Sequence, residues 1–540
     1  MEQTKLLHTF RQARLRGVPI VSIATPDQSA TIAAIQAAEV ERNTNVPLLS
    51  WDICTGLRPL NSIGEIALME LVGIKSDSYN PNNDEQVIVF QNKVRSASLE
   101  PQKALVLIRQ LPGYNEETKA LGSLVFINNA QEILADDFPP PIKSAVRQAI
   151  ANLRDIFEDD HRMLVLLGPD VPLPGALKDD IIPMIQDYPT DDQLKALILD
   201  TFKGARLANP KPELLKKAQD ALRGIAYFPA KQITAMSLST KHDGLDIDAL
   251  RERKRIELEK VEGLSVLRES AGLNFSKVGG KDQLKHMLEL VFHGQQPPGL
   301  AVVIDEGEKF MGEHEATTDQ LAVFLTAMQD EGYTGIILVS APGVGKTHIA
   351  KAVGGQFDVM SVKLDLGATK SKWYGSSEQK IRYLFRVLKA IAGPGGVFFI
   401  LTCNKMEKLP PEFRRRFRRG IWYDDIPNAA EKVDIWTIHL THFGISLDSP
   451  RPDDTGWTGA DIFNCCEGAW NMKISLIEAA QFFVPVSISD PESISSLRAL
   501  AQGSFLSTAY PGEYKGIGEK VTVSSKSPSR TRRIQLTGDN

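Results

Sequence analysis

The stretch VSAPGVGKTHIA, residues 339–350, constrains the fold of this chain more than any other. The apolar run GIILV leads into it, and a helix-forming segment follows its Pro/Gly turn. Strand, loop and helix in this order are the context in which a glycine-rich loop binds phosphate. Gly343 and Gly345 lack a Cβ, so backbone N–H groups can converge on phosphate oxygens. The sequence therefore predicts a phosphate site at the end of a buried strand.

The residues after the glycines supply a cation and a hydroxyl. We expect Lys346 to bind the β- and γ-phosphates of ATP, and Thr347 to coordinate Mg²⁺ at the helix N-terminus. Ser340 stands where the usual G-x-x-x-x-G-K-[ST] pattern has its first glycine. That position mainly eases the turn, so nucleotide binding should survive. The predicted nucleotide contacts in this loop are Pro342, Gly343, Val344, Gly345, Lys346, Thr347 and His348.

An acidic strand, AVVIDEGEKF at 301–310, precedes the phosphate loop, although such strands usually follow it. We expect Asp305 to hold Mg²⁺ through water and Glu306 to orient or activate the attacking water. The carboxyl ends of neighbouring parallel strands share one crevice, so chain order does not prevent the two halves from meeting. No Asp-Glu strand follows the loop, because the next strand, GVFFILTCNK, ends in Thr402, Cys403 and Asn404.

The order of elements predicts two α/β modules. Strands alternate with amphipathic helices in both halves, which indicates parallel sheets covered on both faces. In the second half we expect strands at 299–304, 335–340, 359–364, 397–402 and 421–426. The predicted regions are a first module at 1–240, a charge-rich helical linker at 241–273, an α/β domain at 274–427, a helical lid with a C-terminal helix at 428–515, and a disordered tail at 516–540.

Composition excludes several classes of protein. The 540 residues carry a net charge of −5, which argues against non-specific binding of nucleic acid. The four cysteines are too few for a disulfide framework and fit no zinc pattern. The N-terminus does not read as a signal peptide, and no apolar run approaches the roughly 20 residues of a membrane span. We expect a cytoplasmic protein without a membrane partner.

Residues 397–427, VFFILTCNKMEKLPPEFRRRFRRGIWYDDIP, resemble the second half of an AAA ATPase. The resemblance implies that Asn404 senses the γ-phosphate and that an arginine of PPEFRRRF reaches a neighbouring subunit's ATP site. This segment is one residue shorter than the usual family spacing. Arg416 fits that role best, with Arg415 and Arg414 as alternatives.

Three further stretches extend this resemblance. SKWYGSSEQKIRYLF (371–385) is similar to the family's central-pore loop, which implies a polypeptide grip. TGWTGADIFNCCEGA (455–469) resembles the turn that brings a lid helix to the nucleotide, and NFSKVGGKDQLK (274–285) resembles the segment that lines the adenine pocket. The residues implied are Trp373, Tyr374 and Gly375 for the pore, and Gly459, Ala460, Val278, Gly279 and Gly280 for the nucleotide.

The first half is similar to an AAA subgroup of cyanobacteria and algal plastids that has a degenerate first module. IATPDQSAT holds the phosphate-loop position without Gly-Lys, and VFINNAQ has Asn128 and Asn129 at the acidic position. This module should not hydrolyse ATP. The predicted fold class is therefore α/β: a sheet of the P-loop nucleotidase type with a small helical lid, preceded by a degenerate module of similar plan.

The resemblance implies an Mg·ATP hydrolase that forms a homo-oligomeric, hexameric ring and remodels a protein substrate. A second hypothesis is a scaffold with low turnover that recruits partners through its first module. The exchanged strand order, Ser340 and the shortened arginine segment favour this alternative. A DNA-acting protein is a weaker third hypothesis, because the net charge is acidic.

Overall fold

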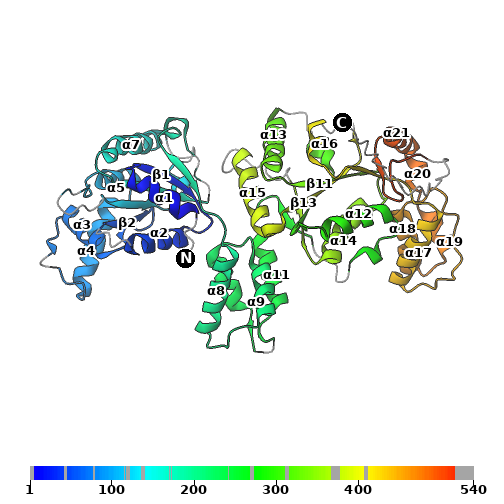
Figure 1. Ribbon diagram of the computed structural model, residues 1–540, viewed down its shortest axis with the longest axis horizontal. Coiled ribbons are helices and arrows are strands. Elements are labelled where there is room, and N and C mark those ends of the chain that lie inside the picture. Colours follow the sequence, from blue (N-terminus) through cyan, green and yellow to red (C-terminus); the bar gives the residue numbers. More distant parts are fainter. Residues whose placement is uncertain are drawn as a thin grey trace, which may run out of the picture.

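The computed structural model describes residues 5–41, 46–76, 79–114, 116, 122–134, 140–169, 171, 173–240, 242–267, 273–310, 315–365, 377–406 and 411–516. Four bodies follow one another along its long axis (Figure 1). An N-terminal sheet domain lies at one end, and a bundle of helices projects beside the next domain. A second sheet domain comes third, and a small helical domain lies at the far end.

The N-terminal domain is a six-stranded sheet in the order β3-β2-β4-β5-β1-β6. All neighbours are parallel except β2 and β3. Ile20 packs into the core on one face and Val21 into the core on the other, so helices cover both faces. The strands are β1 (Ile20–Ala24), β2 (Leu48–Asp52), β3 (Gly56–Pro59), β4 (Leu124–Ile127), β5 (Met163–Gly168) and β6 (Ile182–Ile185), and the helices are α1 (Lys5–Leu15), α2 (Gln28–Glu41), α3 (Ser62–Leu71), α4 (Asp84–Ser98), α5 (Pro101–Ile108), α6 (Ala130–Leu134) and α7 (Pro140–Glu158).

The second sheet has seven strands in the order β15-β14-β11-β13-β10-β12-β9. β10 precedes β11 in the chain, yet it pairs in parallel with β13 on one side and β12 on the other. The strands are β9 (Leu264–Val266), β10 (Leu300–Ile304), β11 (Thr334–Ser340), β12 (Met360–Leu364), β13 (Val397–Cys403), β14 (Ile421–Asp424) and β15 (Leu506–Ser507). All five strands predicted here are confirmed, and the early acidic strand belongs to the same sheet as the phosphate loop.

The two sheets share one spatial plan. Without their outermost additions they read β2-β4-β5-β1-β6 and β12-β10-β13-β11-β14. The strand before the phosphate loop, β1 or β11, takes the same place in each order, and so does the strand with the acidic position, β4 or β10. The two modules differ in the order in which the chain visits these places.

Helices cover both faces of the second sheet, because Val302 and Val303 of β10 enter different cores. The helices of this domain are α12 (Asp282–Phe292), α13 (Glu315–Asp330), α14 (Lys346–Phe357), α15 (Ser377–Ala392) and α16 (Pro411–Arg416). The lid domain consists of α17 (Ala429–Phe443), α18 (Gly459–Met472) and α19 (Leu476–Ala479), and the chain then returns to the sheet through α20 (Val486–Ser489) and α21 (Pro491–Ala501).

The helical bundle corrects the predicted linker. It contains α8 (Asp191–Gly204), α9 (Pro212–Leu222), α10 (Tyr227–Met236) and α11 (Ile247–Leu258). The predicted linker, 241–273, contains α11, which packs on α9 and α10, and β9, which joins the second sheet. Leu250 and Leu258 lie on one buried face of α11, and the charge run that suggested a solvated linker covers the rest of the helix. The bundle shares its core with the second sheet, so the break in packing follows β6 rather than residue 240.

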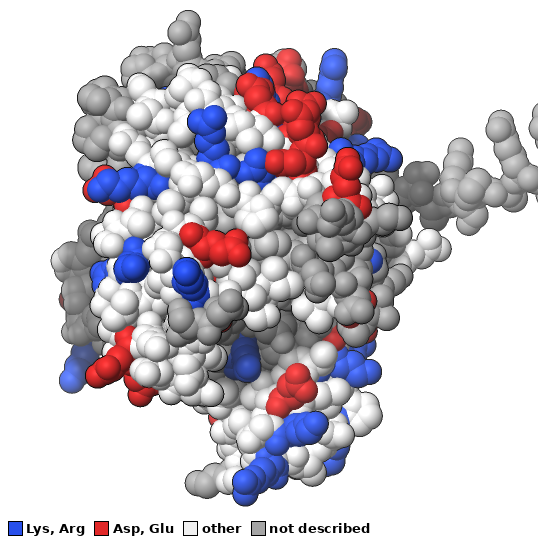
Figure 2. Space-filling view, turned by 90° about the vertical axis from the view of Figure 1, so that its left-hand side faces the viewer, with Lys and Arg blue, Asp and Glu red and all other residues white. Residues whose placement is uncertain are grey.

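The face of the molecule at the N-terminal end has no single dominant charge (Figure 2). The face at the N-terminal end shows Lys and Arg interspersed with Asp and Glu among uncharged residues (Figure 2). Among the described residues, no single helix has both the length and the apolar composition to cross a membrane, although one pair bent by 115°, Gly459–Met472 with Leu476–Ser489, reaches those limits together.

Candidate nucleotide site

The phosphate loop joins β11 to α14 and has the predicted backbone. Gly343 and Gly345 have φ angles of 81° and 110°, a region that favours glycine. A Cβ on Gly343 would lie 3.0 Å from Thr458 Oγ1 and 3.2 Å from the Ala460 Cβ. Gly345 is the N-cap of α14 and provides no side-chain cap. No capping side chain therefore competes with an anion at the first turn of α14.

Lys346 is buried at the centre of this loop. Its Nζ donates to Ser340 O (2.9 Å), Ser340 Oγ (2.8 Å), Ala341 O (3.1 Å) and Asn404 Oδ1 (2.7 Å). Burial lowers the pKa of Lys346 to about 8. Ser340 thus does more than ease the turn, because its hydroxyl binds the ammonium group. The contact with Asn404 brings the predicted sensor residue to the phosphate loop.

Asp305, directly after the acidic strand, lies beside Thr347 of the phosphate loop, where its carboxylate could bind a metal ion. Its Oδ1 accepts from Thr347 Oγ1 at 3.2 Å and from Thr402 Oγ1 at 2.6 Å, and its Oδ2 lies 3.3 Å from Lys363 Nζ. Burial alone would raise the pKa of Asp305, but the Thr402 hydrogen bond and the Lys363 charge hold it below its usual value. An ionised carboxylate beside a threonine hydroxyl is an oxygen donor set that suits Mg²⁺.

Two glutamates follow Asp305. The backbone of Glu306 lies in the left-handed region (φ 54°), and its N–H donates to Thr402 Oγ1 at 3.0 Å. The Glu308 carboxylate accepts from the Asn404 N–H, at 3.2 Å to each oxygen. The sequence reasoning missed Glu308 and Thr402. Glu308 could have been found, since it stands two residues after the predicted catalytic glutamate.

The predicted adenine side is built from three separate segments. A Cβ on Gly279 would lie 2.4 Å from Ile435 Cγ1, so α17 packs directly on the Val278–Gly280 turn. His348 Nε2 lies 2.9 Å from Lys277 O. Ala460 donates its N–H to Gly343 O at 3.0 Å, which brings α18 to the phosphate loop. The Val278–Gly280 turn, the phosphate loop and the lid helices α17 and α18 therefore lie in contact.

A buried ion pair supports this junction and was not predicted. Lys281 Nζ contacts an Asp424 carboxylate oxygen and donates to Val344 O at 3.2 Å. Thr508 Oγ1 donates to the other Asp424 oxygen at 2.9 Å. Sequence reasoning had no signal for this pair, because its two residues lie far apart in the chain.

The arginines of α16 differ in exposure. Arg414 and Arg415 are exposed, whereas Arg416 is half-buried and its Nε is buried without a hydrogen-bond partner. Exposure favours Arg415 over Arg416 as the residue that could reach a neighbouring copy. The predicted pore residues Trp373, Tyr374 and Gly375 lie outside the described residues.

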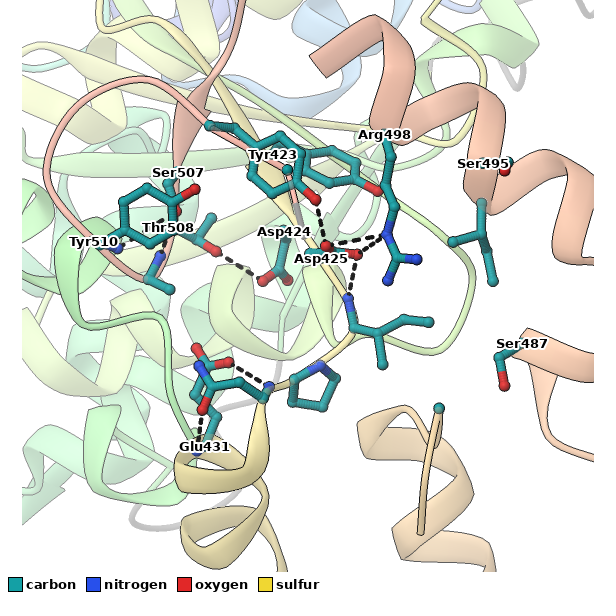
Figure 3. A pocket seen from close by; sticks show the side chains of 18 of the residues that line it. Tyr423, Asp424, Asp425, Glu431, Ser487, Ser495, Arg498, Ser507, Thr508 and Tyr510 are labelled. Atoms are coloured by element: carbon teal, nitrogen blue, oxygen red, sulfur yellow. Dashed lines mark hydrogen bonds and ion pairs between the residues drawn. The ribbon is translucent and has the colours of Figure 1, made fainter. Parts of the chain in front are cut away.

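A separate cavity of about 680 Å³ lies at the hinge between β14 and α17 (Figure 3). Arg498 of α21 contacts Asp425 there, with Nε 2.9 and 3.1 Å from the two carboxylate oxygens, and Tyr514 donates to Asp425 at 2.5 Å. The predicted nucleotide residues do not line this cavity. At this cavity, α21 contacts the end of β14 through Arg498 and Asp425.

Comparison with known families identifies this architecture. Residues 5–185 match the family described as SpoVK-like AAA ATPase, N-terminal domain, and end where β6 ends. Residues 336–395 match the ATPase family associated with various cellular activities, AAA, from β11 through α15. The chain thus contains two regions that match AAA ATPase families, one in each sheet domain. The exchanged strand β10 lies outside the second match, as expected for a strand out of its usual order.

Several curated relatives match most of the chain. The uncharacterized AAA domain-containing protein ycf46 of Gracilaria tenuistipitata var. liui is 23% identical over 80% of this chain and 91% of its own length. The ycf46 protein of Trieres chinensis is 21% identical over 79% of each chain. A probable spastin homolog of Caenorhabditis briggsae is 34% identical, over 25% of this chain and 27% of its own.

Proposed function

We propose that the second module of this protein binds Mg·ATP and hydrolyses it, and that copies of the chain form a ring that remodels protein substrates. The observation that carries the proposal is the meeting of Asp305 with Thr347 at one sheet edge, although their strands come in exchanged order. Bound Mg²⁺ would neutralise phosphate charge. Thr347 and Asp305 would hold it, Lys346 would pair with the phosphates, and Glu306 would orient water.

The exposed arginines of α16 support the proposed ring. Arg415 is exposed and forms no ion pair within the described residues, so it can serve a neighbouring copy. An arginine supplied in trans stabilises the charge of the transition state. Relatives named as homologs of spastin and of cell division cycle protein 48 each match 25% of this chain, which supports a motor of the same family.

Mixing two inactive variants tests this proposal. The Glu306→Gln variant has an inactive catalytic site but can still supply its arginine to a neighbouring copy. The Arg415→Ala variant has an intact catalytic site but cannot supply that arginine. In a randomly mixed ring, about a quarter of the interfaces would combine an intact site with an intact arginine. We expect the equal mixture to recover about a quarter of wild-type turnover. If Arg416 is the residue that acts in trans, the mixture of Glu306→Gln with Arg416→Ala should recover the same fraction. No recovery with either arginine variant would rule out a site shared between subunits.

A nucleotide-dependent scaffold is the second candidate. The observation that favours it is that four protein acceptors already bind the Lys346 ammonium group, so ATP must compete with Ser340, Ala341 and Asn404. Trp373→Ala separates the two functions. A remodelling ring should lose substrate processing and keep ATP binding, whereas a scaffold should keep all its binding properties.

A further inference from the structure

The degenerate module carries a carboxylate where its counterpart carries the phosphate loop. β1 is followed by TPDQ, and β11 by APGVGK. If the prolines Pro26 and Pro342 are matched, Asp27 corresponds to Gly343. α2 then begins at Gln28, directly after this aspartate, whereas α14 begins at Lys346, three residues after the glycine. The N-terminal loop is therefore shorter and has gained an acidic side chain.

In both modules, a backbone N–H at the start of a helix donates a hydrogen bond to the residue after the matched proline. In the AAA domain the N–H of Ala460, the second residue of α18, donates to Gly343 O at 3.0 Å. In the N-terminal module the N–H of Phe228, the second residue of α10, donates to Asp27 Oδ2 at 2.9 Å. Each lid-type helix thus points its N-terminus at the residue after the proline, but the N-terminal module uses a side-chain carboxylate as the acceptor.

Asp27 serves two helices at once. Its Oδ1 accepts from the N–H of Ala30 in the first turn of α2 at 3.0 Å, while its Oδ2 accepts from α10. The N-termini of helices carry partial positive charge and favour anions. A single carboxylate between the starts of α2 and α10 satisfies both ends, which is the electrostatic task that a phosphate group performs between a phosphate loop and a lid.

The remainder of the degenerate site is closed by an amide pair. Gln28 Nε2 donates to Asn129 Oδ1 at 2.7 Å, and the Asn129 N–H donates to Gln28 Oε1 at 2.9 Å. Asn129 takes the place of Glu306, and both residues have left-handed backbones, with φ angles of 49° and 54°. The pair links the segment after β1 to the residues after β4. In the AAA domain, the corresponding region is where the metal ion and the attacking water would lie.

We propose that the Asp27 carboxylate is a built-in substitute for a nucleotide phosphate, which keeps the N-terminal module closed without nucleotide. The consequence extends beyond the module. α10 belongs to the bundle that shares its core with the AAA domain, through Ala230 and Ile233. The bond from Asp27 to Phe228 therefore fastens the N-terminal sheet to the rest of the chain.

Hydrogen exchange of the full-length protein tests this latch. Asp27→Ala should speed exchange at the Phe228 amide and in the first turn of α2 by about tenfold or more, since a hydrogen bond to a charged group is lost at each. Asp27→Asn keeps one acceptor oxygen and should give a smaller increase. Asp187→Asn, at an exposed aspartate between β6 and α8, removes the same charge and should change neither segment. Unchanged exchange in both Asp27 variants would overturn the proposal.

A second arm asks whether nucleotide enters the module. The experiment uses Lys346→Ala, which disables the AAA site, and adds Mg·ATP. We expect no slowing of exchange in residues 20–31 or 226–230, because the position is already filled. Slower exchange there would show that the module binds nucleotide and would overturn the proposal. Neither result depends on hydrolysis at the AAA site, so the two proposals can fail separately.

Discussion

At the residue scale, Thr402 joins the strands whose order is exchanged. Its hydroxyl donates to Asp305 and accepts from the N–H of Glu306, so one side chain of β13 fixes both acids of β10. Glu306 has a left-handed backbone, which costs a residue with a Cβ about 1 kcal/mol. The hydrogen bond from its N–H offsets that cost. The acidic strand is thus aligned to the sensor strand as well as to the phosphate loop.

Replacing Thr402 tests this alignment. Thr402→Val keeps the shape of the side chain and removes the hydroxyl, so we expect kcat to fall about ten- to a hundredfold while ATP affinity changes little. Steady-state kinetics and nucleotide titration measure the two quantities. Thr437→Val is a suitable control, because the Thr437 hydroxyl bonds only within α17. A wild-type kcat in Thr402→Val would mean that the acids are positioned without it.

The buried ammonium group of Lys346 predicts how ATP binding depends on pH. Burial lowers the pKa of Lys346 to about 8 from an ordinary value of 10.5, so the free protein loses this positive charge above pH 8. Phosphate attracts the charged form, and binding above pH 8 must therefore take up a proton. ATP affinity should be flat below pH 7 and fall towards tenfold per pH unit above pH 8.

Calorimetric titration at pH 8.5, in buffers of different ionisation enthalpy, measures this proton uptake. Lys346→Arg should show none, because a guanidinium does not titrate in this range. An affinity for wild type that stays constant to pH 10 would contradict the account.

At the scale of elements, local patterns predicted the strands and the loop, but not what packs against them. GIILVSAPGVGK and AVVIDE specify strand and loop within a few residues, so β10, β11 and the proximity of Asp305 to Thr347 could be predicted from the sequence. The Lys281–Asp424 pair depends on residues brought together only by the fold. α11 was misjudged because charged residues dominate its sequence, while its buried face is carried by Leu250, Lys254 and Leu258.

Lys254 makes that buried face testable. Its Nζ donates only one long hydrogen bond, 3.4 Å to Asp220 O, and burial lowers its pKa to about 7. Between pH 7 and its ordinary value of 10.5 the unfolded chain binds more protons than the folded chain, so wild-type stability should rise with pH in this window.

Lys254→Met should raise the free energy of unfolding at pH 7 by on the order of 1–3 kcal/mol and remove that rise. Denaturant titrations at pH 7 and 9 measure both effects. Lys216→Met, at an exposed lysine of α9, should do neither. A loss of stability in Lys254→Met would mean that the ammonium group supports the bundle.

At the scale of the whole molecule, the helical bundle is the joint between the two sheets. The Tyr188 hydroxyl lies 3.3 Å from that of Tyr383 on α15, and a Cβ on Gly393 would lie 3.1 Å from Arg223. α15 begins at Ser377, two residues after Gly375, the last of the predicted pore residues. A displacement of α15 would therefore reach the bundle first, and through the Asp27 bond the N-terminal sheet.

Mg²⁺-dependent ATP hydrolysis by Glu306→Gln, beside wild type and Glu308→Gln, tests the central claim most directly. The claim is that the early strand β10 completes the site of the later phosphate loop. We predict wild-type turnover, its loss in Glu306→Gln with ATP still bound, and a smaller loss in Glu308→Gln, whose carboxylate accepts from the backbone N–H of Asn404 directly after the sensor strand. Full turnover in Glu306→Gln would contradict the account.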